Sequence, residues 1–294
     1  MTPDMTNHRP SFAIHWLMVF VLCLSAFFSF LALNNARRFH PDEALYMSFA
    51  RHAAVDGDWL LLRQPVDKTP LTFYANAFAL VFFAVETDTD GVLQLDALKG
   101  ESAGRMTSVF ASILLVAVMM QLVRTTTNNK IAPILAGLLL ALSPLRIVFA
   151  PTAFTDMPML LLGCVALWMA VRGQSLWSGF WLSLSIAAKP QIIFYTPLLI
   201  GFIIFKAYSH KNYLDGLRQL IYFFAPILIG IGLLWGWDAM LIAHGAESFY
   251  LLGRSHYTIT ELTPLHDISN RMAGWWASIQ YILGNGWLTL MGLG

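Results

Sequence analysis

Charged residues are scarce in this chain. Lys, Arg, Asp and Glu together make up 12% of its 294 residues, whereas a soluble globular domain typically carries about 25%. Hydrophobic residues make up 57%, and the mean hydropathy is +0.61. Because long apolar runs recur along the sequence, this balance excludes an ordinary soluble domain and predicts a polytopic membrane protein. The formal net charge of +1 provides no basic field for binding nucleic acid.

Cysteine is also scarce, since the chain has only two. Cys23 and Cys164 both lie in apolar runs, so we expect neither a disulfide framework nor a thiolate metal site. The sequence has no low-complexity tract and no internal repeat. Its first apolar run, residues 12–33, is too long for the core of a signal peptide and predicts a retained helix.

Long apolar segments along the sequence predict an all-α fold with about eight transmembrane helices. A helix needs about 20 residues to span a membrane. The segments are 12–33, 106–123, 131–149, 157–171, 178–188, 191–205, 219–236 and 275–293. Lys189-Pro190-Gln191 separates the two short segments. These are either two thin spans or one broken helix, which is tolerated only where it lines a protein-enclosed or wet cavity.

The distribution of charge predicts the orientation. If the amino terminus is cytoplasmic, the inner segments hold seven of the 18 basic residues and two of the 17 acidic ones. The seven are Arg9, Arg124, Lys130, Arg172, Lys206, Lys211 and Arg218, and the two acids are Asp4 and Asp215. This matches the excess of Lys and Arg that cytoplasmic loops carry. The loop from 34 to 105 and the segment from 238 to 274 are then extracytoplasmic.

The large first extracytoplasmic loop is expected to carry interfacial helices. Pro41 at a helix start, with acids in the first turn, predicts a helix that ends at Gly57-Asp58. A second helix begins at Thr69-Pro70, with Thr69 as a possible cap, and its apolar run 71–85 is too short to span and is rich in aromatics. We expect it to lie at the membrane interface. Residues 86–96 form an acidic, solvated turn.

The adjacent acids Asp42 and Glu43 are the first candidate functional residues. A carboxylate at a membrane surface can accept a proton from an attacking hydroxyl or amine. The simpler interpretation, of equal weight from the sequence alone, is that both acids merely begin a helix. Adjacent residues point in different directions on a helix, so one acid can face substrate while the other braces the loop.

Other polar residues fall on the same predicted side of the membrane. Lys68 can meet a phosphate at headgroup depth or simply snorkel to the interface. Asp156, in a short turn between two spans, is a helix cap or a supporting acid, and Arg146 could pair with it. Lys189 lies at the helix break. Further along, Arg254 offers a bidentate phosphate contact; His256 is a metal-ligand candidate, although a lone His is more often a hydrogen-bonded polar residue.

These motifs in this order resemble the GT-C superfamily of polytopic glycosyltransferases that use polyprenyl-phosphate sugars. Within that superfamily, the chain is most similar to the dolichyl-phosphate-mannose protein mannosyltransferase-like family and the lipid A aminoarabinose transferase. The resemblance covers about residues 12–240. The motifs that carry it are Pro41-Asp42-Glu43-Ala44 with Tyr46, Gly57-Asp58-Trp59, Asp67-Lys68-Thr69-Pro70-Leu71 with Tyr74, Glu101 with Arg105, and Asp156.

The resemblance implies a site on the extracytoplasmic face of a bacterial inner membrane. Asp42 would be the catalytic base and Glu43 its support, while Lys68, with Arg254, would bind the donor phosphate. Tyr46, Asp156 and Lys189 would support the site. Asp67 falls where related transferases place an acid near a divalent cation, with His256 as a further ligand by residue type. The partners implied are a polyprenyl-phosphate sugar, a lipid, glycan or protein acceptor, and the bilayer.

Three segments follow from this interpretation. Residues 1–240 are expected to form the GT-C-like module, 241–274 an extracytoplasmic loop, and 275–294 a further transmembrane helix. Because the sequence stops inside an apolar run, we expect it to be a fragment of a longer protein. Two alternative functions remain at this stage: a lipid-linked sugar flippase or transporter, and a membrane scaffold subunit whose outer loop binds a partner.

Overall fold

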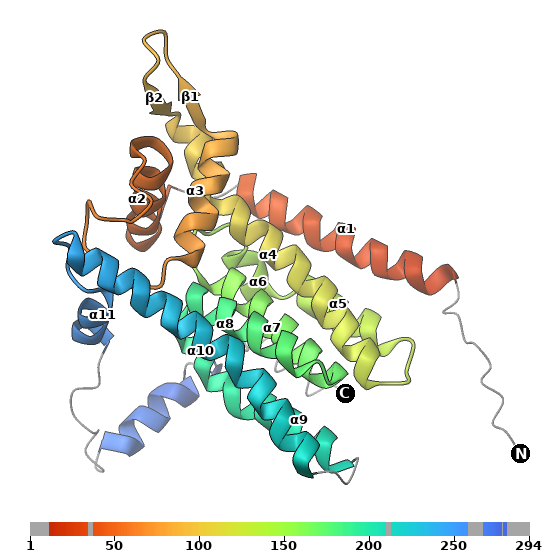
Figure 1. Ribbon diagram of the computed structural model, residues 1–294. Helices are drawn as coiled ribbons and strands as arrows, with labels where there is room; N and C mark the ends of the chain where they lie inside the picture. Colours follow the sequence, from red (N-terminus) through yellow and green to blue (C-terminus); the bar gives the residue numbers. More distant parts are fainter. Residues whose placement is uncertain (1–11, 35–37, 210–212, 258–266, 278, 281–294) are drawn as a thin grey trace, which may run out of the picture. The chain divides into compact units, whose positions relative to one another are not determined.

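The computed structural model of the chain describes residues 12–34, 38–209, 213–257, 267–277 and 279–280. It is 79% helical (Figure 1). The helices before residue 130 are α1 (Phe12–Asn34), α2 (Pro41–Asp56), α3 (Leu71–Phe83) and α4 (Ala97–Thr126). They are followed by α5 (Ala132–Ala141), α6 (Pro144–Phe149), α7 (Asp156–Arg172), α8 (Ser175–Ala188), the 3-10 helix η1 (Pro190–Tyr195), α9 (Thr196–Ser209), α10 (Tyr213–Ala243) and α11 (Phe249–Tyr257).

Three of the described helices, α1, α4 and α10, are long and apolar enough to cross a membrane by length and composition. The helices α3, α5 and α8 and the segment 190–206 are apolar but shorter. These features agree with the predicted all-α membrane protein. The number of spans and their orientation stay predictions.

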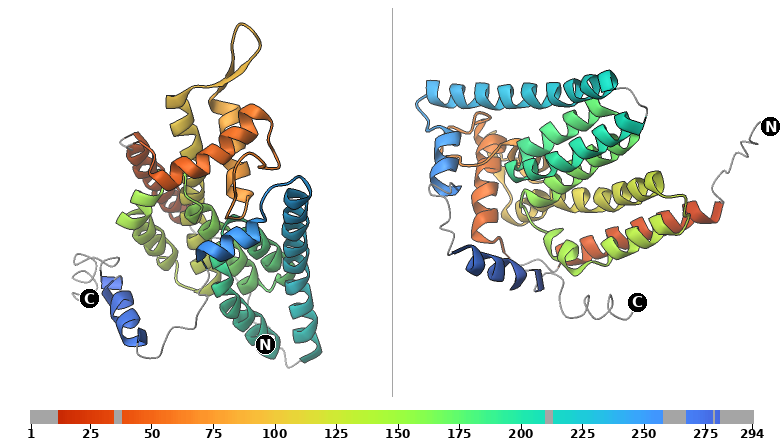
Figure 2. Two further views of the ribbon diagram at one scale, coloured as in Figure 1. Left: turned by 90° about the vertical axis from the view of Figure 1, so that its left-hand side faces the viewer. Right: turned by 90° about the horizontal axis from the view of Figure 1, so that it is seen from below.

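Five of the helices pack in a row that follows their order in the chain. α4 packs against α1 and α7, α7 against α8, and α8 against α10, so α1 and α10 lie on opposite sides of this row (Figure 2). Gly173, in the left-handed conformation, lets the chain turn back between α7 and α8. Gly179 of α8 allows a close approach to α10, because a Cβ there would overlap the carbonyl of Phe223.

The predicted helix in the first loop is confirmed as α2. It begins at Pro41 and ends before Gly57, which adopts the left-handed conformation at φ 71°. Its buried side packs on α3, where Phe49 and Phe73 have ring centroids 4.9 Å apart. This core also includes residues from the start of α4. It is the layer on which the candidate site is built.

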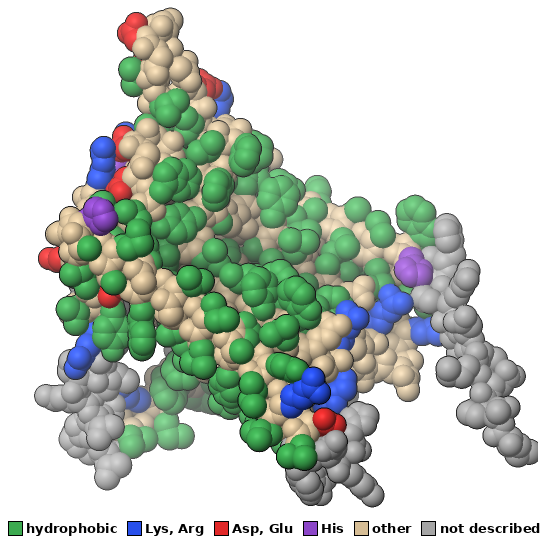
Figure 3. Space-filling view, viewed as in Figure 1, with side chains coloured by type: hydrophobic (Ala, Val, Ile, Leu, Met, Phe, Trp, Pro, Cys, Tyr) green, Lys and Arg blue, Asp and Glu red, His purple; other side chains and the backbone are tan. Residues whose placement is uncertain are grey.

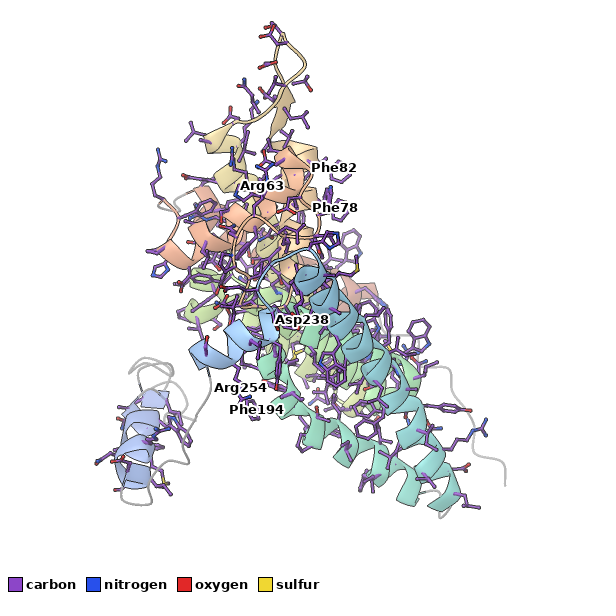
Figure 4. The ribbon with its side chains drawn as sticks, turned by 60° about the vertical axis from the view of Figure 1, so that its left-hand side comes forward. Arg63, Phe78, Phe82, Phe194, Asp238 and Arg254 are labelled. Atoms are coloured by element: carbon purple, nitrogen blue, oxygen red, sulfur yellow. The ribbon has the colours of Figure 1, made fainter. Side chains whose placement is uncertain are left out.

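The second predicted helix in this loop is α3, but Thr69 does not cap it. Pro70 occupies the N-cap position, and no side chain accepts a hydrogen bond from the first turn there. Phe78 and Phe82 are exposed and point away from the core (Figure 4). Such aromatics suit a membrane interface, although the interfacial placement stays a prediction. The predicted acidic turn is a hairpin of two antiparallel strands, β1 (Val85–Thr87) and β2 (Leu93–Leu95).

The apolar run 131–149, predicted as a span, is not one continuous helix. The run is divided into α5 and α6 at Leu142-Ser143, because Pro144 lacks the N–H that would continue the helix. Ser143 instead caps α6 through the N–H of Arg146. The buried Arg146 guanidinium folds back and donates hydrogen bonds to the carbonyls of Leu140 (3.0 Å) and Ala141 (2.7 Å) at the end of α5.

Arg146 also joins this break to two other helices. Its Nη1 donates to the hydroxyls of Ser29 in α1 (2.9 Å) and Ser112 in α4 (2.8 Å). The predicted pairing of Arg146 with Asp156 is therefore wrong. The guanidinium is held by two hydroxyls and by two carbonyls at the end of α5, of which that of Leu140 also accepts from the N–H of Ser143.

Replacing Arg146 by Met is expected to lower the free energy of unfolding by about 2 kcal/mol or more, because buried carbonyls would lose their donors. Thermal unfolding of the detergent-solubilised protein measures the change. The matched control is Arg172→Met, which removes a guanidinium that contacts the ring of Trp168 at the end of α7; it should have little effect. If Arg146→Met unfolded at the wild-type temperature, the hydrogen bonds to α5 would not stabilise the fold.

One end of the helices carries a basic cluster with few acids. Figure 3 shows Asp and Glu side chains mainly around the hairpin and α2, a group of Lys and Arg side chains at the opposite ends of the helices, and apolar side chains between them. The basic end includes Arg124, Arg172 and Lys206, each in the last turn of its helix. This is the separation on which the predicted orientation rests.

The chain divides into two compact units, Met1–Leu252 and Gly253–Gly294. In the first, α10 continues to Ala243 and α11 begins at Phe249, within the segment predicted to be a loop over 241–274. In the second, residues 267–277 are helical. Most of the predicted span 275–293 lies outside the described residues.

Candidate functional site

The first turn of α2 presents Asp42 to solvent. His40 caps the helix, since its Nδ1 accepts a hydrogen bond from the N–H of Asp42 at 3.3 Å. The Glu43 carboxylate reaches back and accepts from the N–H of His40 at 2.9 Å, which completes a reciprocal cap. The Asp42 side chain is 63% exposed. A fixed first turn therefore holds an accessible carboxylate.

Glu43 points the opposite way and is buried. Its Oε1 accepts hydrogen bonds from Nε of Arg105 at 3.1 Å and from the N–H of Ala153 at 2.9 Å. The side chains of this ion pair are only 6% and 5% exposed. The two adjacent acids thus diverge, as their spacing predicted. Glu43 ties the start of α2 to α4 and to the turn before α7.

That turn, residues 150–155, connects Glu43 to two further predicted residues. Ser108 of α4 donates a hydrogen bond to the carbonyl of Phe154 at 3.1 Å, next to the Ala153 amide that Glu43 holds. The turn leads directly into Asp156, whose carboxylate lies 2.6 Å from Nζ of Lys189. The helix break after α8 is therefore joined to the start of α7 by a partly exposed ion pair.

Lys68 lies against Tyr46 of α2. Tyr46 follows Asp42 by four residues and Glu43 by three, so it shares a face of the helix with both. Nζ of Lys68 is 5.0 Å from the centroid of the buried Tyr46 ring, and a charged group over an aromatic face is attracted to it. Lys68 Nζ also lies 3.4 Å from the carboxylate of Asp67. The ring of Phe154 is 6.3 Å from that of Tyr46.

The loop that carries Lys68 is fixed by its own backbone contacts. The Asp58 carboxylate accepts hydrogen bonds from the N–H groups of Leu62 (3.0 Å) and Arg63 (2.9 Å). Leu61 has a left-handed φ of 62° and is buried in the core of α2 and α3, a strained conformation that persists only where the surroundings enforce it. Lys68 is thus placed by an ordered loop.

The end of α2 is also held electrostatically against this loop. A hydrogen bond from His52 lowers the pKa of the Asp56 carboxyl, and the Arg63 guanidinium, 3.1 Å away, adds to the effect. A carboxyl with a lowered pKa in the folded state stabilises the fold above its ordinary pKa, and that stabilisation is lost as the pH falls. The ionised state of Asp56 therefore supports the loop at neutral pH.

The structure brings most of the predicted residues into one neighbourhood. Asp42, Glu43, Tyr46, Asp67 and Lys68 surround the start of α2, and Asp156 and Lys189 follow the turn that Glu43 holds.

Two predicted residues, Arg254 and His256, belong to the second compact unit. Arg254 lies on α11 in the second compact unit (Figure 4), and the side chain of His256 lies outside the described residues. Asp238 at the end of α10 fixes the start of α11 by accepting hydrogen bonds from the Ser248 hydroxyl and the Phe249 N–H, each at 2.8 Å.

Sequence reasoning did not assign the partner of Glu43. Arg105 was part of the motif set, and a buried arginine just before a long apolar helix does require a carboxylate or carbonyl partner. Nothing local identifies which acid that is, because 62 residues separate the two. The contributions of Ser108 and Phe154 were likewise not predicted, since neither belongs to a charged motif.

Among the residues that the structure describes, the surroundings of Asp67 do not suit a cation. Within the part of the chain that the structure describes, no three His, Cys, Asp or Glu side chains gather where they could hold a metal ion. The Asp67 carboxylate lies beside the Lys68 ammonium, and a neighbouring positive charge weakens cation binding. We therefore derive no step through a metal.

Comparisons with known proteins returned no match: no protein-family profile, no curated protein and no solved structure is significantly similar to the chain.

Proposed function

We propose that the protein is a membrane glycosyltransferase. It moves a sugar from a polyprenyl-phosphate donor to a hydroxyl or amine of an acceptor, on the extracytoplasmic face of a bacterial inner membrane. The observation that carries the proposal is the placement of the accessible Asp42 carboxylate one helical turn from Tyr46, over whose ring Lys68 lies. An accessible base and a phosphate-binding cation, both close to the first two turns of one fixed helix, suit such a transfer.

In this mechanism Asp42 acts as the general base. Its carboxylate takes the proton from the acceptor O–H or N–H, and the acceptor atom forms a bond to the anomeric carbon of the sugar. The bond between that carbon and the phosphate oxygen breaks, and the electron pair leaves with the polyprenyl phosphate. Lys68 stabilises the charge on this leaving group. Because attack occurs opposite the leaving group, the anomeric configuration is inverted.

The buried contacts of Glu43 support this role for its neighbour. Glu43 is bound by Arg105 and Ala153 and caps its own helix, so it is not available to substrate. It is a positioning residue that fixes the depth and direction of Asp42. One accessible base with one bound acid also differs from the two facing carboxylates of a glycoside hydrolase.

Replacing Lys68 by Ala is expected to weaken donor binding about 10- to 100-fold, the effect of losing one charge-assisted hydrogen bond of about 1.5–3 kcal/mol. Calorimetric titration of the purified protein with farnesyl phosphate measures the change. Lys99→Ala is the control, because Lys99 is an exposed lysine paired with Glu86 near the hairpin. Equal affinities of Lys68→Ala and wild type would remove the phosphate role.

A lipid-linked sugar flippase is the second candidate. The observation that favours it is the interruption between α8 and η1, where Lys189 adopts an extended conformation and binds Asp156. Transporters often bind substrates at such breaks. In proteoliposomes, a flippase would move the intact donor between leaflets, whereas a transferase would consume the donor when an acceptor is added.

A further inference from the structure

Three buried polar side chains form a stripe on α3 and the residues just before it. Thr69, Thr72 and Asn76 are spaced by three and four residues, so they follow one face of the helix. The residues are 2%, 1% and 1% exposed, respectively. This face adjoins the one through which Phe73 packs on α2. α3 also packs against α4 and α8.

The stripe contains polar atoms that the fold does not satisfy. Within the described part of the chain, the hydroxyls of Thr69 and Thr72 and both polar side-chain atoms of Asn76 have no hydrogen-bond partner. Buried polar groups are nearly always hydrogen-bonded, and an unpaired one destabilises the fold. Four unpaired polar atoms in a single stripe therefore need an explanation.

The amino terminus of α3 lies at the same end of this stripe. Its N-cap residue, Pro70, has no N–H and provides no capping side chain. The first-turn N–H groups of a helix have no intrahelical partners, and their aligned dipoles favour an anion. Lys68 comes two residues before Pro70 and adds a positive charge. Thr69 lies between them.

We infer that this stripe binds the sugar-phosphate headgroup of the donor, an inference that rests on the proposed function. The Thr69 hydroxyl, the first-turn amides of α3 and Lys68 bind the phosphate. Thr72 and Asn76, four residues and so about 6 Å apart along the helix axis, exchange hydrogen bonds with the sugar hydroxyls. The ligand would satisfy the groups that the fold leaves unpaired. Because these side chains are covered, neighbouring side chains move aside when it enters.

We expect two apolar substitutions to raise the stability of the protein while they weaken its binding of the sugar. Thr72→Val and Asn76→Leu should raise the unfolding temperature of the ligand-free protein, since each removes an unpaired buried group. Each should also weaken binding of a sugar-bearing lipid by about tenfold or more. The affinity for farnesyl phosphate, which has no sugar, should be unchanged. The probes are farnesyl phosphate and its mannose, glucose and 4-aminoarabinose conjugates, titrated calorimetrically.

The control is Ser178→Ala in α8, another fully buried hydroxyl without a partner among the described residues. It should raise stability but leave all affinities unchanged. Thr72→Ser, which keeps the hydroxyl, should retain sugar-dependent binding. The near-isosteric Thr72→Val keeps the test decisive if Asn76→Leu does not fold.

Two results would overturn the inference while leaving the proposed function intact. One is that the apolar variants gain stability but bind the sugar conjugates as the wild type does. The other is that the wild type binds no conjugate more tightly than farnesyl phosphate. If the wild type does not bind farnesyl phosphate or any conjugate, the proposed function fails as well.

Discussion

Replacing Asp42 by Asn is expected to reduce sugar transfer by about 10²- to 10⁴-fold, the usual contribution of a general base. Asn is nearly isosteric with Asp but cannot accept the proton of the acceptor. Asp42 is exposed and the cap of α2 is made by His40 and Glu43, so the substitution should not disturb the fold. The measurement is single-turnover transfer from a radiolabelled polyprenyl-phosphate sugar to an acceptor.

The unfolding temperature and the donor affinity provide the controls for this variant. Both should match those of the wild type, because neither the ion pair of Glu43 nor Lys68 is changed. Asp42→Glu keeps a carboxylate on a side chain that is one methylene longer, and this variant should retain part of the activity. Wild-type transfer by Asp42→Asn would rule out Asp42 as the base.

The second large effect is expected at the buried ion pair. Replacing Arg105 by Met leaves the Glu43 carboxylate buried without its counter-charge, which should lower the free energy of unfolding by about 3–5 kcal/mol. Glu43→Leu should be similarly destabilising, because it removes the carboxylate that balances the charge of the buried Arg105 guanidinium. The double variant, Glu43→Leu with Arg105→Met, buries no charge and should be more stable than either single variant. Thermal unfolding of the four proteins gives this double-mutant cycle.

A matched control lies one turn away on α4. Glu101 pairs with Arg38 at 3.2 Å, and the Arg38 side chain is largely exposed, so Arg38→Ala should have little effect on stability. If the double variant regains stability but not transfer activity, Glu43 acts by positioning Asp42. If the single substitutions were as mild as Arg38→Ala, the ion pair between Glu43 of α2 and Arg105 of α4 would not stabilise the site.

The local parts of the fold could be predicted from the sequence. The bounds of α2 follow from short-range chemistry, since Pro41 favours a first helical position and Gly57 a left-handed end. The broken segment at Lys189-Pro190 was also visible. In contrast, the prediction of a span over 131–149 did not take into account that Ser143-Pro144 begins a new helix. Assigning Thr69 as a cap failed because Pro70 takes that position.

The candidate site was only partly predictable, because many of its contacts join residues that are far apart in the sequence. The positions of Asp42, Lys68 and Asp156 follow from motifs, but their surroundings are set by contacts between distant segments. Glu43 binds an amide that lies 110 residues away. The partner of Asp156 proved to be Lys189 and not Arg146. A single sequence contains no local signal for such pairs, because several acids and bases of the predicted outer loops are equally available.

The central claim is that the protein uses a polyprenyl-phosphate sugar as donor. Mass spectrometry of lipids that co-purify with the protein, before and after candidate acceptors are added, tests it most directly. We expect a bound polyprenyl-phosphate sugar that disappears when the right acceptor is supplied, as glycosylated acceptor and free polyprenyl phosphate form. A bound lipid-linked sugar that no acceptor consumes, or the absence of any such lipid, would contradict it.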